Sequence, residues 1–206
     1  MENVLIPRFE TEELVENTLI YLDKLFPNRN LKVIDLGCGS GCIGITLKKK
    51  VPLLDVTLLD SSSKSLEIAK KNAKVLETEV SFLENDMLEG INDKFDIIIS
   101  NPPYFVSSED LKNKNEYLRM ARHEEFLTLK SLINTVKLNL NNDGCFYLVH
   151  RYSRLNEIKK ELNDNSLYIN RLCLVYDQNK IDPVSVLIKA SFKESEIVLE
   201  NKIVTR

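Results

Sequence analysis

The chain has 206 residues, enough for one large domain or two small ones with a sizeable core. Its hydrophobic content of 43% and net charge of −3 are ordinary for a soluble globular protein, and no apolar run approaches the roughly 18 residues of a membrane span. Four cysteines without a Cys-x-x-Cys pair, only two histidines and no signal-peptide pattern lead us to expect a reduced, cytoplasmic protein with no metal and no membrane partner.

Apolar residues recur with helical and strand-like spacing in alternation along the chain. We expect helices over residues 10–26, from the glycine turn at 37–41 to 50, and over 63–76, 127–140 and 153–162. We expect strands over 32–36, 56–60, 80–83, 95–100, 145–149, 172–176 and 184–190, with a turn at 142–144 before the fifth. This order predicts an α/β fold in one domain over residues 1–206. Its core is a doubly wound, mostly parallel seven-stranded sheet that ends in an antiparallel hairpin.

The most informative motif is Asn101-Pro102-Pro103-Tyr104, which directly follows the predicted strand over 95–100. Proline fixes φ and donates no hydrogen bond, so neighbouring carbonyls are held in place and left free to accept. A fixed carbonyl, an amide oxygen and a stackable ring suit the binding of a planar group that bears an NH2. The motif therefore predicts N-methylation of an amide or of a nucleobase. A proline-rich turn that only closes the strand is the alternative.

A glycine turn follows the first predicted strand, where ligands bind in parallel α/β sheets. Gly37, Gly39 and Gly41 come directly after Asp35, in the spacing Gly-x-Gly-x-Gly. A dinucleotide site would have Gly-x-Gly-x-x-Gly, but Cys42 occupies the position of its third glycine. The observed spacing lets the backbone approach a ligand closely without forming a phosphate cradle. Tight packing between strand and helix is the alternative.

Two further aspartates, Asp60 and Asp86, follow the next two predicted strands. A carboxylate at the first of these positions can accept both hydroxyls of a ribose. The second falls where it could hold an adenine amino group. Each aspartate alone is more often a cap or a turn former, but together with Asp35 they predict a nucleoside site.

These residues together resemble the Rossmann-type S-adenosylmethionine-dependent amino-methyltransferases, and the resemblance covers nearly the whole chain. It implies a class I methyltransferase fold with S-adenosyl-L-methionine as cofactor. It also implies that Asp60 binds the cofactor ribose, that Asp86 lies near the adenine, and that the glycine turn lies under the methionine portion. The domain then divides into a cofactor-binding half, residues 1–104, and a substrate-side half, residues 105–206.

The predicted chemistry starts from a weak nucleophile, because the lone pair of an amide or aniline-like nitrogen is delocalised. The Asn101 side-chain oxygen and the Pro102 carbonyl can accept its two N–H bonds and so localise the lone pair toward the methyl group. Tyr104 would stack on the planar group and orient it. We therefore expect Asn101, Pro102 and Tyr104 to be catalytic, with Pro103 and Phe105 beside the substrate.

The first half resembles one family of such enzymes in more detail. Residues 5–16 (Leu-Ile-Pro-Arg-Phe-Glu-Thr-Glu-Glu-Leu-Val-Glu) are similar to the Pro-Arg-Pro-Glu-Thr-Glu signature of the bacterial protein-(glutamine-N5) methyltransferases that modify peptide-chain release factors. Phe9 replaces the second proline. The segment lies beside the cofactor in that family, which implies Thr11 as a cofactor-binding residue. From the residues alone, it is a helix N-terminus whose acidic first turn suits the helix dipole.

The second half resembles the bacterial adenine-N6 methyltransferases of valine tRNA, through residues 113–116, 121–124 and 150–155. The Glu-Pro and the closing Gly-x-Asp-Arg of the glutamine enzymes are absent, as is their separate helical N-terminal domain. The entry segment of the tRNA family is missing too. The chain therefore reads as a splice at the shared Asn-Pro-Pro-Tyr motif, whether natural, truncated or chimeric.

We expect the second half to determine which substrate is bound, because it follows the Asn-Pro-Pro-Tyr motif and lines the substrate side of the site. Six of its cations suit phosphate contacts: Arg122, His123, Arg151, Arg119, His150 and Arg154. The first three of these are predicted to bind the substrate. Each alone is more often a solvated surface charge, and His150, at a strand end, could instead be a satisfied core residue. A tRNA adenine can be splayed out and stacked on Tyr104 and Phe105. Adenine N6 in tRNA is therefore the preferred substrate, with a glutamine of a release factor as the alternative. An inactive cofactor- or RNA-binding module is a second alternative.

Overall fold

The computed structural model describes residues 9–25, 29–102 and 129–204. Its helices are α1 (Phe9–Leu25), α2 (Cys42–Lys50), α3 (Ser63–Val75), α5 (Leu129–Asn139) and α6 (Leu155–Asp164), the last preceded by the short 3-10 helix η3 (Tyr152–Arg154). Its strands are β1 (Lys32–Leu36), β2 (Asp55–Asp60), β3 (Ser81–Glu84), β4 (Phe95–Ser100), β5 (Leu140–Arg151), β6 (Tyr168–Asp177), β7 (Pro183–Ser191) and β8 (Val198–Val204).

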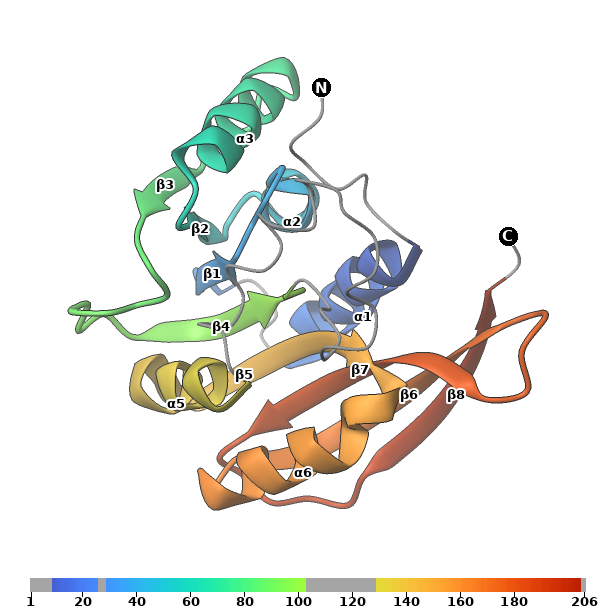
Figure 1. The fold of residues 1–206 in the computed structure, drawn as a ribbon. Helices are drawn as coiled ribbons and strands as arrows, with labels where there is room; N and C mark the ends of the chain where they lie inside the picture. Colours follow the sequence, from blue (N-terminus) through green and yellow to red (C-terminus); the bar gives the residue numbers. More distant parts are fainter. Residues whose placement is uncertain (1–8, 26–28, 103–128, 205–206) are drawn as a thin grey trace, which may run out of the picture.

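One sheet runs through the molecule in the order β3-β2-β1-β4-β5-β7-β6-β8 (Figure 1). The first five strands of this order are parallel, and β7 is antiparallel to both β5 and β6. The predicted α/β fold and its antiparallel C-terminal hairpin are confirmed. The predicted number of strands was too low, because an eighth strand, β8, pairs in parallel with β6.

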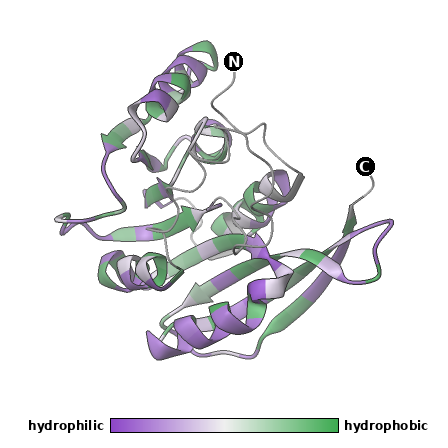
Figure 2. Ribbon diagram, viewed as in Figure 1, coloured by the Kyte–Doolittle hydropathy of each residue, from purple (hydrophilic) through white to green (hydrophobic). Residues whose placement is uncertain are grey.

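Helices cover both faces of the sheet, and each face has its own core. On one face α1, α2 and α3 bury a cluster that includes Leu14, Ile45 and Leu66 against the strands. On the other face α5 and α6 bury a second cluster that includes Ile133 and Ile158. In Figure 2 the surface of α6 is mostly hydrophilic, so this helix contributes only a narrow apolar stripe to the core. No helix in the described ranges is long and apolar enough to cross a membrane.

Two local predictions were wrong. The turn expected at 142–144 lies inside β5, where the pairing with β4 shifts between Leu140 and Cys145. The Asn141 side chain donates to Asp96 at 2.7 Å, so a contact between strands holds these polar residues in the sheet. The helix after β5 does not begin at Ser153, because that residue lies in η3 and Arg154 is the N-cap. By contrast, α3 lies within the range expected for it, and the Ser62 side chain caps it by accepting from the Ser65 N–H.

Candidate active site

The candidate site lies at the carboxyl ends of β2, β1 and β4, which are neighbours in the sheet. Leu36 at the end of β1 is in register with Leu59 on one side and Ser100 on the other. The strand order reverses here, and such a switch point is where open α/β sheets bind ligands. Because adjacent strands are about 4.8 Å apart, Asp60 and Asn101 lie roughly 10 Å from each other across the end of β1.

The glycine turn after β1 is held from two sides. The backbone N–H groups of Gly37 and Cys38 both donate to the Leu59 carbonyl, each at 2.9 Å. The Asn72 side chain of α3 donates to the Ser40 carbonyl at 2.9 Å. The turn is therefore tied to both β2 and α3, so its shape is fixed by the surrounding fold.

Glycine is required at this turn for its backbone conformation. Gly37 and Gly39 have φ values of +71° and +55°, and an added Cβ would meet no heavy atom of the described chain within 4 Å at either position. Most side chains are strained at such φ values. These two residues therefore expose backbone to open space, which is the geometry that a close-lying ligand needs.

The other two glycines of this region serve the packing of α2. A Cβ at Gly41 would lie 2.9 Å from both Ile45 and Leu58 side-chain atoms. A Cβ at Gly44 would overlap the Leu58 side chain and lie 3.1 Å from Val56. Sequence reasoning missed Gly44. Its signal was a glycine in the first turn of the helix that follows the glycine turn.

The Asp60 carboxylate lies at the end of β2 and faces the turn. Its Oδ2 atom accepts from the Gly39 N–H at 2.8 Å, and its Oδ1 atom accepts from the Ser62 N–H at 2.9 Å. The side chain is partly exposed and is fixed by these two backbone donors. A carboxylate held in this way presents its remaining lone pairs to the space above the turn.

Asp35 lies below the turn and is 1% exposed. Its Oδ2 atom accepts from the Gly44 N–H at 3.0 Å, whereas its Oδ1 atom has no hydrogen-bond partner within the described residues. The pKa of Asp35 is raised to about 7, chiefly because burial desolvates the carboxylate; the Gly44 hydrogen bond lowers the pKa and the nearby Asp60 charge raises it, and both effects are smaller. No cation within the described ranges contributes to the pKa of this carboxyl by stabilising its charged form.

Asp86 lies in an exposed turn after β3. Its N–H donates to the Asn85 side chain at 3.0 Å, and its carbonyl accepts from Glu89. A hydrogen bond connects this turn to the end of β2, because the Asn85 N–H donates to the Asp60 carbonyl. The structure thus brings Asp86 to the same sheet edge as Asp60, one strand further out.

Asn101 follows β4, and its side chain contacts α1. Its Nδ2 atom donates to the Thr11 hydroxyl at 2.8 Å, and Thr11 is only 5% exposed. The residue before it, Ser100, donates from its hydroxyl to the Leu36 carbonyl at 3.0 Å, which ties the end of β4 to the end of β1. The sequence implied a cofactor contact for Thr11. It gave no indication of this contact with Asn101, since 90 residues separate the two.

The remaining predicted residues divide into two groups. Pro102 is buried next to Asn101, and Arg151 is half-buried at the end of β5. Six predicted residues lie outside the described ranges: Pro103, Tyr104, Phe105, Arg119, Arg122 and His123.

Two of the predicted phosphate-binding cations do not fit that role. His150 is 4% exposed, and desolvation by burial together with the charge of Arg154 lowers its pKa to about 4, so the ring is neutral at neutral pH. Its Nδ1 atom accepts from the Arg151 N–H at 2.9 Å. Arg154 forms an ion pair with Glu157 in the next turn. His150 is therefore the core residue that the sequence offered as the alternative, and it does not supply a positive charge.

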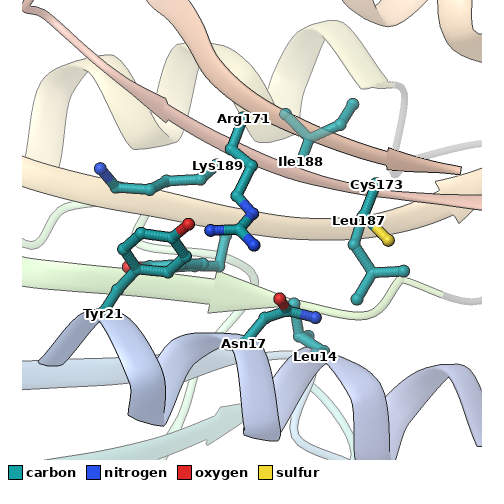
Figure 3. A pocket seen from close by; sticks show the side chains of 9 residues that line it. Leu14, Asn17, Tyr21, Arg171, Cys173, Leu187, Ile188 and Lys189 are labelled. Atoms are coloured by element: carbon teal, nitrogen blue, oxygen red, sulfur yellow. The ribbon is translucent and has the colours of Figure 1, made fainter. Parts of the chain in front are cut away.

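Two cavities lined by described residues lie away from the carboxyl ends of the strands. One, of about 10 Å³, lies between α1 and the sheet, where the Arg171 guanidinium stacks 4.5 Å from the Tyr21 ring centre (Figure 3). It has room for about one water molecule. The other, of about 210 Å³, lies at the amino ends of the strands and is lined by Lys32, Asp55 and Phe95 among others. Neither coincides with the candidate site.

Metal ligands and reactive thiols are not part of the described site. No group of three His, Cys, Asp or Glu side chains in residues 9–25, 29–102 and 129–204 could hold a metal ion. Burial raises the pKa of the Cys42 thiol to about 11 and that of the Cys38 thiol further. Both thiols are thus protonated at neutral pH, which leaves nucleophilic catalysis by cysteine without support.

Comparison with known proteins identifies the family and the fold. Residues 8–165 match the model of the methyltransferase small domain family. The chain is 37% identical over 195 residues to a release factor glutamine methyltransferase of Flavobacterium psychrophilum, an alignment that covers 82% of this chain and 68% of that protein. A release factor glutamine methyltransferase of Lactococcus lactis is 34% identical over 160 residues, covering 74% of this chain and 58% of the relative.

Solved structures share the fold at low sequence identity. A putative class I S-adenosylmethionine-dependent methyltransferase from Listeria monocytogenes superposes with a TM-score of 0.67 at 15% identity, covering 92% of this chain and 64% of that one. Together, the fold and the family match define a methyltransferase with the fold of the class I enzymes. The chain belongs to the methyltransferase small domain family, and the two relatives named above are release factor glutamine methyltransferases.

Proposed function

We propose that this chain transfers a methyl group from S-adenosyl-L-methionine to the side-chain amide nitrogen of a glutamine in a peptide-chain release factor. The observation that carries the proposal is the position of Asn101 at the switch point of the sheet. The relatives of the chain are named release factor glutamine methyltransferases, which supports the same activity. The same relatives favour glutamine over the tRNA adenine that the second half of the sequence suggested. Since release factors act in the cytoplasm, the proposal also keeps the expected location.

The residues present fit the cofactor. Open space above Gly37 and Gly39 gives room for its methionine portion against the backbone. The partnerless Oδ1 atom of Asp35 lies below the turn, where a positive charge would stabilise its ionised form. Asp60, fixed by two backbone donors, would accept the ribose hydroxyls, and Asp86 would lie toward the adenine.

The cofactor supplies an electrophilic methyl group whose leaving group is a neutral thioether. The protein's part is to orient the substrate amide and to strengthen its nucleophilicity. The Asn101 side-chain oxygen and the Pro102 carbonyl would accept the two N–H bonds of the amide, so the nitrogen lone pair is localised toward the methyl group as charge develops. The methylated nitrogen carries a positive charge and then loses a proton to solvent without a general base.

The surroundings of Asn101 support this role. Its Nδ2 atom is engaged by Thr11, so its carboxamide has a defined orientation in which nitrogen faces α1. The bond from Ser100 to the Leu36 carbonyl fixes the backbone on the other side. Preorganised acceptors of this kind cost little reorganisation during the reaction. Because His150 is neutral and Arg154 is ion-paired with Glu157, these two residues offer less positive charge to an RNA phosphate.

Transfer of tritium from labelled S-adenosyl-L-methionine tests the proposal. The chain is incubated with a purified release factor in one reaction and with bulk tRNA in another, and the label in each macromolecule is counted. We expect label in the release factor, lost when its target glutamine is replaced by alanine. Label in tRNA alone would overturn the proposal in favour of adenine. If neither is labelled while titration shows cofactor binding, the chain is an inactive module.

A further inference from the structure

Strand β8 is the last strand of the sheet, at the end opposite β3 (Figure 1). On its inner side it pairs with β6 over seven positions, from Val198 opposite Arg171 to Val204 opposite Asp177. No strand within the described ranges pairs with its outer side. The outer side therefore presents a row of backbone N–H and C=O groups suited to pairing with another strand.

The edge lacks most of the devices that prevent such pairing. Natural edge strands are interrupted by proline, by β-bulges or by charges that repel a second strand. β8 contains no proline, and its register with β6 is regular throughout. Its large apolar residues are exposed, with Leu199 at 59% and Ile203 at 73%. The remaining device is charge, which here comes from Glu200 and Lys202.

These two charges match each other when the strand meets a copy of itself. In an antiparallel pair centred on Asn201, Glu200 of each copy lies opposite Lys202 of the other, and Leu199 lies opposite Ile203. Asn201 then lies opposite its own copy. Opposite charges and apolar pairs across strands stabilise a sheet. Centring the pair on Glu200 or on Lys202 would instead set like charges against each other, so the charge pattern selects one register.

The side chains already point in the directions that this pairing requires. Glu200 forms an ion pair with Arg171, and Lys202 forms ion pairs with Glu13 and Glu16, so both charges lie on the α1 face. Because side chains alternate along a strand, Leu199, Asn201 and Ile203 lie on the opposite face. They are exposed there in the single chain. Pairing would cover Leu199 with Ile203 of the second copy, and the reverse.

We propose that two copies of this chain associate through antiparallel pairing of their β8 strands, about a two-fold axis at Asn201. The interface is isologous, so it closes after two copies and does not propagate. The sheet would become continuous across the pair. β4, which carries Asn101, is separated from β8 by β5, β7 and β6. The candidate active site therefore stays open, and the proposal is independent of the proposed function.

The mass of the chain in solution, measured by sedimentation equilibrium across a range of concentrations, gives the first test. A single strand pair is a small interface, so we expect a concentration-dependent dimer rather than a permanent one. A chain that stays monomeric at all concentrations up to hundreds of micromolar would overturn the proposal.

Two matched variants test the register. In the proposed pair, position 199 of each copy lies opposite position 203 of the other. The double variant Leu199→Glu/Ile203→Glu therefore places like charges opposite each other at both places, whereas Leu199→Glu/Ile203→Lys places opposite charges there. Within one chain, these positions are four residues apart on an exposed strand face, so the two variants differ little as monomers. We expect the first to be monomeric and the second to dimerise, with an affinity that falls as salt rises. Equal dimerisation of the two variants would contradict the proposed register.

A cross-link provides a measurement that does not depend on those substitutions. Residues opposite each other in an antiparallel pair have Cβ atoms about 5 Å apart, within reach of a disulfide after small adjustment. Asn201→Cys should therefore form a disulfide-linked dimer under mild oxidation. Ile181 lies between β6 and β7 and is 95% exposed, so Ile181→Cys is the control and should not form a disulfide-linked dimer. Linkage of the control but not of Asn201→Cys would show that the copies meet through another surface.

Discussion

The side chain of Asn101 donates a hydrogen bond from Nδ2 to the Thr11 hydroxyl at 2.8 Å, across 90 residues of sequence. Thr11 is in the first turn of α1, and α1 is in turn fixed to the edge of the sheet through Glu13 and Lys202. The orientation of the Asn101 carboxamide thus depends on a helix that precedes the whole sheet. We infer that Thr11 acts as a positioning residue for Asn101, although the sequence suggested a cofactor contact.

Replacing Thr11 tests this role. Thr11→Val keeps the shape of the side chain but removes the acceptor, so the Asn101 carboxamide loses its fixed orientation. We expect kcat to fall about tenfold, the equivalent of roughly 1.4 kcal/mol, with cofactor affinity changed less than twofold. Thr11→Ser retains a hydroxyl and should keep most of the activity. A large loss of cofactor affinity in Thr11→Val with kcat unchanged would instead show that Thr11 contacts the cofactor, as the sequence suggested.

Asn101 itself should matter for the chemical step and little for the cofactor. Asn101→Ala removes one of the two acceptors proposed to bind the substrate amide. We expect the rate of methyl transfer to fall by about two to three orders of magnitude, as when a preorganised hydrogen-bonding group is removed elsewhere. Cofactor affinity, measured by isothermal titration, should stay within a few-fold of the parent. A comparable loss of cofactor affinity would mean that Asn101 serves mainly to bind the cofactor.

The parts of the fold that follow from local patterning were predictable from sequence. β1 and β4 have the bounds that their apolar runs indicate, because buried parallel strands are nearly continuous hydrophobic segments. The glycine turn and Asp60 were found because strand-end residues of a parallel sheet meet at one edge. These features depend on spacing along the chain, and spacing is visible in the sequence.

The features that sequence missed depend on contacts between distant segments. β8 was missed because Glu200-Asn201-Lys202 interrupts its apolar pattern, and only the structure shows Glu200 and Lys202 paired with Arg171 and Glu13. The sequence left His150 open between a phosphate-binding cation and a core residue, because burial at a strand end depends on segments that are distant in the sequence; the structure shows the residue 4% exposed. Gly44 looked like an ordinary helical residue until the side chain of Leu58 was seen against it.

The titration of Asp35 should be coupled to cofactor binding. In the free protein burial raises its pKa to about 7, so part of the population carries this proton at neutral pH. The positive charges of the cofactor would lower that pKa, so binding should release protons and tighten as pH rises from 6 to 8. Isothermal titration in buffers of different ionisation enthalpy measures the release. Asp35→Asn is the control, because it retains only the protons contributed by the cofactor itself. Equal proton release in the two proteins would contradict the coupling.

Gly44 should be required for stability. A methyl group at this position would overlap the Leu58 side chain where α2 crosses β2. We expect Gly44→Ala to lower the free energy of unfolding by about 1 to 3 kcal/mol, measured with denaturant. Adding Leu58→Val removes atoms from the point of overlap, so the double variant should be more stable than the sum of the single effects. Strictly additive effects would show that the overlap is not the cause.

The buried groups Asp35 and His150 should affect the pH dependence of stability in opposite directions. The folded pKa of His150 is lowered to about 4 from 6.5, so its contribution is complete above about pH 6.5 and is lost as pH falls toward 4. The folded pKa of Asp35 is raised to about 7 from 3.8, so its contribution is complete below about pH 3.8 and is lost as pH rises toward 7. The two shifts correspond to roughly 3 to 4 kcal/mol for His150 and roughly 4 to 5 kcal/mol for Asp35, and their effects on the pH dependence of stability largely cancel between pH 4 and 6.5.

In single variants, the free energy of unfolding should therefore change with pH more steeply than in the parent protein, where the two contributions cancel. In His150→Gln only the Asp35 contribution remains, and the free energy of unfolding should fall by about 2 kcal/mol from pH 4.5 to 6.5 relative to the parent. Asp35→Asn should show the opposite change over the same range. The double variant should return to the parent slope. Denaturant unfolding at several pH values measures all four proteins, and single variants with the parent's slope would mean that these two groups titrate normally in the folded chain.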